Sequence, residues 1–195
     1  MGIVLTGEEK RDSAEKHSLE SLNRFLSVIG HQDDRAMVLS LAAFIEDTLG
    51  RLLLAYFRKC KATRALVEGF NAPLGTFSSR IKSVYAFGLV TEDQYRDMDV
   101  LRKVRNLFAH NWEGVSLERS DIQGMVGQIS GYTVAQDEIK GGTREKLLGT
   151  LSTCCIELQV FVGRLETGKA VKAPDVSHRL ATEKPTGYAY QRYVE

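Results

Sequence analysis

The segment from residue 33 to residue 60 is apolar on two sides at helical spacing, which strongly restricts the folds open to this chain. One stripe consists of Leu41, Ile45, Leu49, Leu52 and Tyr56, and a second of Leu39, Ala42, Leu53 and Phe57. Residues three and four apart share one face of a helix, so each stripe needs its own packing partners. We therefore predict a long central helix over 33–60, begun by Asp33 or Asp34 as N-cap and enclosed by other helices.

Helical periods fill most of the remaining chain and predict the partners of this central helix. The expected segments are an amphipathic stretch ending at Gly30, a short helix over 76–88 ended by Gly88, a helix over 92–110, a short helix or turns within 111–142, and a long helix from Thr143 to about residue 167. No strand alternation or internal repeat competes with this interpretation. The sequence thus predicts an all-α fold, a single helical bundle of about five to seven helices.

The start of the 92–110 helix carries the sharpest local signal. Thr91 and Gln94 have the spacing of a capping box, in which each side chain bonds the other residue's backbone N–H. Val90 and Tyr95 flank them at the spacing of a hydrophobic staple. We therefore expect the helix to begin immediately after Thr91.

The length of 195 residues fits one domain with appendages. Residues 1–18 are expected to form a polar N-terminal arm, residues 19–167 the helical bundle, and residues 168–195 an extended or flexible C-terminal tail. The apolar period fails from Gly168 onward, and Pro174 and Pro185 fall in this last part.

Composition excludes several kinds of protein. With 26 basic and 25 acidic residues the net charge is +1, which gives no global attraction to nucleic acid or to a membrane surface. The longest apolar run, at residues 52–57, is far too short to span a membrane. The three cysteines lack zinc-binding spacing, and we expect them to be buried in a protein of the reducing cytoplasm, with no metal and no cofactor.

The candidate functional residues lie at the end of the 92–110 helix, in the stretch VRNLFAHNW (104–112). Arg105 can hold a phosphate as a planar fork, and His110 can accept or donate a proton near neutral pH. Asn106 can hold a phosphate oxygen or orient His110. Two structural alternatives stay open. Arg105 is also suited to a buried ion pair with Glu46, and a histidine in the last turn interacts favourably with the helix dipole.

Two resemblances bear on these alternatives. The sequence RNLFAH, 105–110, looks like the arginine-histidine motif of the HEPN superfamily, which implies a small helical bundle, often dimeric, and in many members a metal-independent ribonuclease. The longer stretches 33–53 and 73–110 resemble the mannitol operon repressor family, and the likeness extends over roughly residues 20–165. This second resemblance implies a role in the regulation of transcription.

We expect a regulatory protein that acts through an unidentified protein partner, because no helix-turn-helix with a basic recognition helix is present. The small basic cluster Lys59, Lys61 and Arg64 is interpreted as a solvated helix end. The alternative is an endoribonuclease that uses Arg105, Asn106 and His110, with Glu46 in support, acting on RNA at a composite site. Such a site needs two copies. The two apolar stripes on 33–60, together with the HEPN resemblance, predict a homodimer in either case.

Overall fold

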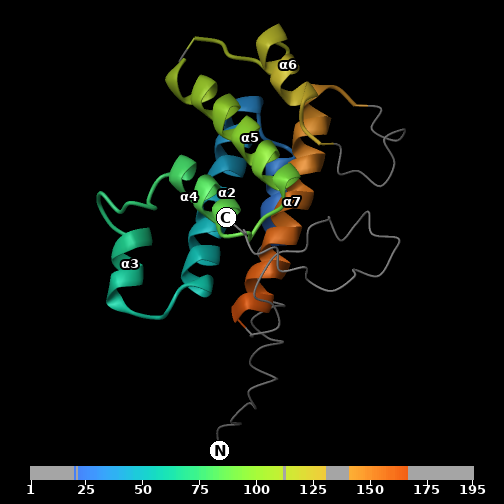
Figure 1. The fold of residues 1–195 in the computed structure, drawn as a ribbon. Helices are drawn as coiled ribbons and strands as arrows, with labels where there is room; N and C mark the ends of the chain where they lie inside the picture. Colours follow the sequence, from blue (N-terminus) through green and yellow to red (C-terminus); the bar gives the residue numbers. More distant parts are fainter. Residues whose placement is uncertain (1–19, 21, 112, 131–140, 167–195) are drawn as a thin grey trace, which may run out of the picture.

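The computed structural model describes residues 20, 22–111, 113–130 and 141–166. A helical segment at residues 22–29 is followed by α2 (Asp34–Tyr56), α3 (Lys61–Val67), α4 (Phe77–Ala86), α5 (Glu92–His110), α6 (Ser120–Gly127) and α7 (Thr143–Glu166). This part of the chain contains no strand, which confirms the predicted all-α bundle (Figure 1). The predicted arm 1–18, the tail 168–195 and Trp112 lie outside the described residues.

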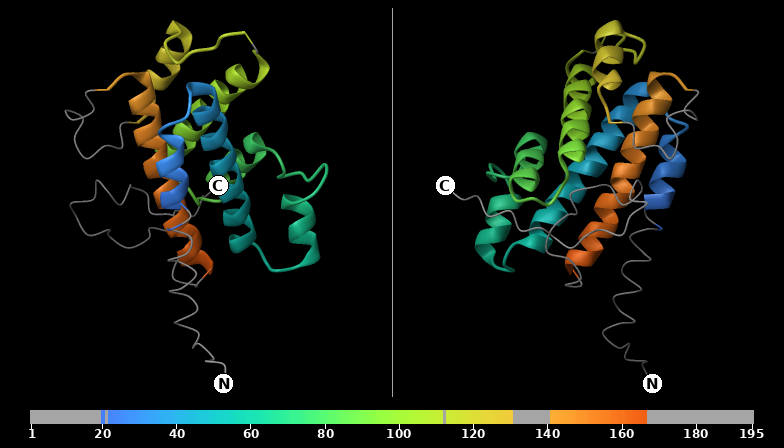
Figure 2. Two further views of the ribbon diagram at one scale, coloured as in Figure 1. Left: turned by 180° about the vertical axis from the view of Figure 1, so that it is seen from behind. Right: turned by 45° about the vertical axis from the view of Figure 1, so that its right-hand side comes forward.

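Helix α2 is the central element of the bundle. It packs most extensively against α7, then against α5 and α4, and Figure 2 shows α7 running along its length. Most residues of the two predicted stripes are fully buried, among them Leu41, Ile45, Leu49 and Leu53. Leu39 and Phe57 are half-buried, and Tyr56 is exposed. Since both stripes find partners within one chain, they give no argument for a dimer, and the homodimer stays a prediction.

Helix α7 is the element in the described ranges that is long and apolar enough to cross a membrane by length and composition alone. Its apolar side chains Leu151, Leu158 and Val162 are buried against the rest of the bundle. Packing against α2 therefore accounts for its apolar character.

The predicted extent of the central helix is wrong at its C-terminal end. Helix α2 ends at Tyr56, because Phe57 adopts an extended conformation and its ring packs edge-on against Phe87, with 5.5 Å between ring centroids. The chain then turns and begins α3, a helix that the sequence pattern did not predict. Cys60 precedes α3 and is exposed, so the expected burial is wrong for Cys60 and confirmed for Cys154 and Cys155.

The guanidinium of Arg80 ties α3 and the following loop to α2. It donates to the backbone oxygens of Glu46 at 2.8 Å, Leu74 at 3.0 Å and Val67 at 3.1 Å. This path requires a glycine on α2, since a Cβ atom at Gly50 would lie 2.9 Å from Nη1 of Arg80. One side chain from α4 thereby supplies hydrogen-bond donors to three separate segments of backbone.

The capping box at the start of α5 is confirmed. The backbone N–H of Gln94 donates to Thr91 Oγ1 at 3.2 Å, and that of Thr91 donates to Gln94 Oε1 at 3.0 Å. The amide of Gln94 also donates to Glu157 of α7 at 2.8 Å. A local signal thus fixes where α5 begins, and Gln94 joins that end to α7.

Replacing Thr91 with alanine should destabilise the protein by about 1 kcal/mol, the usual cost of losing an N-cap hydroxyl. Urea denaturation followed by circular dichroism measures this free energy of unfolding. The control Thr91→Ser keeps the hydroxyl and should retain most of the stability. Equal denaturation midpoints for the wild type and Thr91→Ala would show that the cap is dispensable.

Asp97 is buried in the bundle, although it lies among charged residues in the sequence. Its carboxylate accepts hydrogen bonds from the backbone N–H of Ser130 at 2.9 Å and from the Ser130 hydroxyl at 2.6 Å. Burial raises the pKa of Asp97 from 3.8 to about 6, against the opposing effect of the two Ser130 bonds. Asp97 therefore holds the segment after α6 against α5.

A raised pKa in the folded state means that folding favours the protonated carboxyl. The stability that Asp97 contributes is therefore full below its ordinary pKa of 3.8 and is lost as the pH rises through about 6. The substitution Asp97→Asn introduces an uncharged amide that mimics the protonated acid, so it should remove this dependence. Above pH 6 the variant should be more stable than the wild type by roughly 1–3 kcal/mol.

The measurement is the difference in unfolding free energy between the wild type and Asp97→Asn across this pH range. Asp99→Asn, which removes an accessible partner of Arg102 and Lys103, serves as the control with the same change of charge. A constant difference between the wild type and Asp97→Asn at every pH would contradict the raised pKa.

Candidate functional site

Three of the four predicted site residues lie in the last two turns of α5. Arg105 and Asn106 are half-buried and His110 is exposed. Nη1 of Arg105 donates to Oδ1 of Asn106 at 3.2 Å, so the amide orients the guanidinium. The structure therefore brings Arg105 and Asn106 into contact and leaves His110 accessible to solvent at the helix end.

The fourth residue, Glu46, lies on α2 and does not pair with Arg105. Among the described residues no ion pair involves Arg105, and the role shown for Glu46 is to accept a bond from Arg80 through its backbone oxygen. The expected buried ion pair is thus not formed. Arg105 keeps most of its five donors for solvent or a ligand.

The end of α5 is held in place by an arginine that sequence reasoning did not identify. Arg35, on the first turn of α2, donates from its two terminal nitrogens to the backbone oxygens of Phe108 and Asn111. These carbonyls would otherwise lack helical partners, and a cation at a helix C-terminus is favourable. Because Phe108 is fully buried, this turn is anchored on both sides.

Only the folded chain could reveal Arg35, which lies more than seventy residues from the carbonyls that it caps. The consequence for the candidate site is a rigid base. His110 is exposed on a helical turn whose backbone is fixed, while one chain supplies one arginine and one histidine. The described residues include no group of three or more His, Cys, Asp or Glu side chains that could hold a metal ion.

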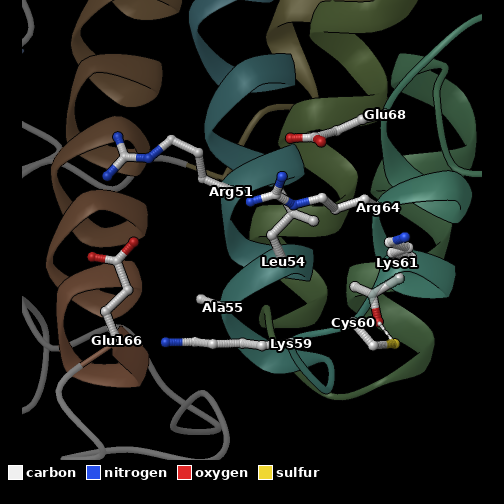
Figure 3. Close-up of a pocket in the computed structure, with 10 residues that line it drawn as sticks. Arg51, Leu54, Ala55, Lys59, Cys60, Lys61, Arg64, Glu68 and Glu166 are labelled. Carbon is white, nitrogen blue, oxygen red and sulfur yellow. Dashed lines mark hydrogen bonds between the residues drawn. The ribbon is translucent and has the colours of Figure 1, made fainter.

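A second candidate site is a pocket between the C-terminal end of α2, the helix α3 and the C-terminal end of α7 (Figure 3). It joins the basic cluster Lys59, Lys61 and Arg64 to Arg51 of α2. The sequence pattern placed the cluster at a solvated helix end because it did not predict α3. A break in apolar periodicity after Phe57 is the signal that would have separated the two helices.

Comparison with known proteins finds relatives of similar sequence and a solved structure of similar fold. No protein-family profile matches the chain. The mannitol operon repressors of Escherichia coli strain K12 and of strain O6:H1 (CFT073) are each 25% identical to it over 126 residues. The aligned region covers 62% of this chain and spans 61% of the length of each repressor.

A solved structure has the same fold. A chain in the X-ray structure of the MtlR-HPr complex from Escherichia coli superposes with a TM-score of 0.52 and 19% sequence identity. The match covers 74% of the present chain and 98% of that chain. The helical arrangement described above is therefore shared with a protein of known architecture.

The geometry at the end of α5 predicts how two substitutions affect stability. His110→Ala should change the unfolding free energy by no more than about 0.5 kcal/mol, because an exposed side chain is removed. Arg105→Ala should cost up to about 1 kcal/mol, since a half-buried stem and one hydrogen bond are lost.

Arg35→Ala provides the contrast, because it removes the donor to two carbonyls and should cost roughly 1–3 kcal/mol. Thermal and urea unfolding of the three variants would show this order. A loss of stability in His110→Ala as large as that in Arg35→Ala would identify His110 as a structural residue.

Proposed function

We propose that this chain is a regulatory protein that acts by binding another protein. The observation that carries the proposal is the fold shared with a chain of the solved MtlR-HPr complex, which is an assembly of two proteins. The 25% identity to the mannitol operon repressors supports the same role. By this proposal the chain controls transcription through protein contacts and binds HPr or a protein like it.

A cluster of exposed aromatic side chains is the best-suited surface for such a contact. Tyr56 and Phe87 are each 41% exposed, and their rings stack with 5.8 Å between centroids. Phe57 packs beside both rings. Aromatic residues are enriched in protein interfaces, where they bury large areas at little entropic cost. We define Tyr56, Phe57 and Phe87 as the aromatic cluster.

The proposal is tested by titrating purified HPr into the full chain and recording heat and sedimentation. A complex with saturable binding is expected, and Tyr56→Ser with Phe87→Ser should weaken it by about tenfold or more, as expected for buried aromatic contacts. Val28→Ser removes an exposed apolar side chain at another site and should bind like the wild type.

Absence of any complex would contradict the role proposed for HPr. Equal binding by the double variant and the wild type would instead move the contact away from the aromatic cluster. The two results are therefore distinguishable.

A second candidate function is metal-independent cleavage of RNA. Its supporting observation is that Arg105 is not engaged by a described carboxylate and lies on the same anchored helix end as the exposed His110. An arginine to bind phosphate and a histidine to transfer a proton are the groups that such a reaction needs. The full site would require a homodimer with two copies of each residue.

Incubating the full chain with RNA in the presence of EDTA tests this candidate directly. Cleavage that disappears in His110→Ala, in a protein whose mass by light scattering is twice that of the chain, would support it. Intact RNA with the wild-type chain would reject it, whatever the outcome with HPr.

A further inference from the structure

The pocket between α2, α3 and α7 carries an excess of positive charge. Four cations line it, Arg51, Lys59, Lys61 and Arg64, together with two carboxylates, Glu68 and Glu166. In Figure 3 Lys59 extends toward Glu166 on α7, Arg64 extends from α3 toward α2, and Arg51 extends from α2 toward α7. The volume of the pocket is about 720 Å³.

These charges are not neutralised within the part of the chain that the structure describes. None of the six charged residues forms an ion pair there, whereas Arg102, Lys103 and Arg144 elsewhere each contact a carboxylate. Four cations and two carboxylates leave two positive charges in a concave site. Low-dielectric walls concentrate the field of such charges and attract anions.

Arg51 is positioned before any ligand binds. Its Nη1 donates to Oε1 of Gln159 on α7 at 3.2 Å, and the amide of Gln159 donates to Thr48 at 3.2 Å. Because Thr48 and Gln159 are buried, these hydrogen bonds hold the guanidinium of Arg51 in place. Among described residues Arg51 uses one of its five donors, and the others are available to a ligand. Because the side chain is already held, it loses less conformational entropy on binding than a freely rotating arginine would.

The donor set and the size of the pocket select the class of anion. Arginine forks and lysine ammonium groups bind phosphate oxygens, and a phosphate monoester carries close to two negative charges near neutral pH. The volume lies within the range of small-molecule sites and far exceeds that of a bare phosphate. Leu54 and Ala55 provide an apolar surface, and the two carboxylates can accept bonds from hydroxyl groups.

We propose that the basic pocket binds a small phosphate monoester with an organic, hydroxyl-bearing part. This site is separate from the end of α5. None of the aromatic cluster lines it, although Tyr56 and Phe57 follow Leu54 and Ala55 directly in the sequence. The inference does not depend on the function proposed above. It assigns a ligand to residues that otherwise leave two positive charges without a partner among the described side chains.

The pocket contains its own reporter. Cys60 lies in its lining and is exposed, whereas Cys154 and Cys155 are buried, so Cys60 is the thiol accessible to reagents in the folded chain. Its Sγ lies 3.4 Å from the hydroxyl of Thr63. Hydrogen bonds from the Thr63 side chain and backbone lower the pKa of this thiol, which favours its reactive form.

The test measures the rate at which iodoacetamide, an uncharged reagent, modifies Cys60 in the full chain. Ribose 5-phosphate is the probe, and ribose and sodium chloride at matched ionic strength are the controls. We expect ribose 5-phosphate to slow modification in a saturable manner, while ribose and chloride leave the rate unchanged. Inorganic phosphate should protect more weakly.

Substitutions connect this protection to the pocket. Arg64→Gln and Lys59→Gln change exposed side chains and are combined in one double variant. The half-saturating concentration of ribose 5-phosphate should rise at least about tenfold, as expected from lost charge-assisted hydrogen bonds. Arg119→Gln controls for the loss of an exposed cation elsewhere, because it lies at the N-cap of α6, at the other end of the bundle (Figure 1).

A second measurement separates the charge of the pocket from the binding of a ligand. Iodoacetate and iodoacetamide react with thiolates by the same displacement and differ in charge. The rate of modification of Cys60 by iodoacetate, divided by the rate with iodoacetamide, should fall in the double variant Arg64→Gln, Lys59→Gln. It should stay constant in Arg119→Gln.

Three outcomes would overturn the proposal. They are the absence of saturable protection, equal protection in the pocket variant and the wild type, and protection by chloride or ribose alone. Protection by polyglutamate or an RNA oligonucleotide without any by ribose 5-phosphate would also reject it, since the site would then serve a macromolecule.

Discussion

The burial of two faces of α2 is the constraint on which the other helices depend. Its two apolar stripes require α7 and α5 along its length and α4 beside them, and the segment at 22–29 adds Phe25, which stacks on Phe44 at 4.3 Å. The same helix builds both candidate sites. Arg35 in its first turn fixes the end of α5, and Arg51 near its last turn faces the basic pocket. Sixteen residues of helix separate these two arginines by about 24 Å.

Sequence reasoning succeeded where the determining contacts are local. The start of α5 follows from Thr91 and Gln94, three residues apart, and the end of α4 from Gly88, which has a positive φ of 66°. The apolar period predicted α2 as the central helix because both of its apolar faces can be recognised within one continuous segment. The class of fold and most helix positions were therefore predictable without any long-range contact.

Apart from α3, the features that sequence reasoning missed depend on residues far apart in the chain. Asp97 looks like a surface residue until Ser130 and the end of α6 cover it. Phe57, just beyond the end of α2, packs edge-on against Phe87, and no local pattern shows this contact. Arg105, Asn106 and His110 were identified by their types and spacing, but only the folded chain shows that Arg105 contacts Asn106 and does not pair with Glu46.

The close approach of Arg80 to Gly50 makes these two positions dependent on each other in any related sequence. A side chain at position 50 would displace the guanidinium from its place against α2 and weaken its hydrogen bonds to the carbonyls of Val67 and Leu74. Since these carbonyls help to hold α3 against the bundle, the wall of the basic pocket that α3 forms depends on this contact. Covariation of positions 50 and 80 should therefore divide relatives of this chain into those that keep the pocket and those that have lost it.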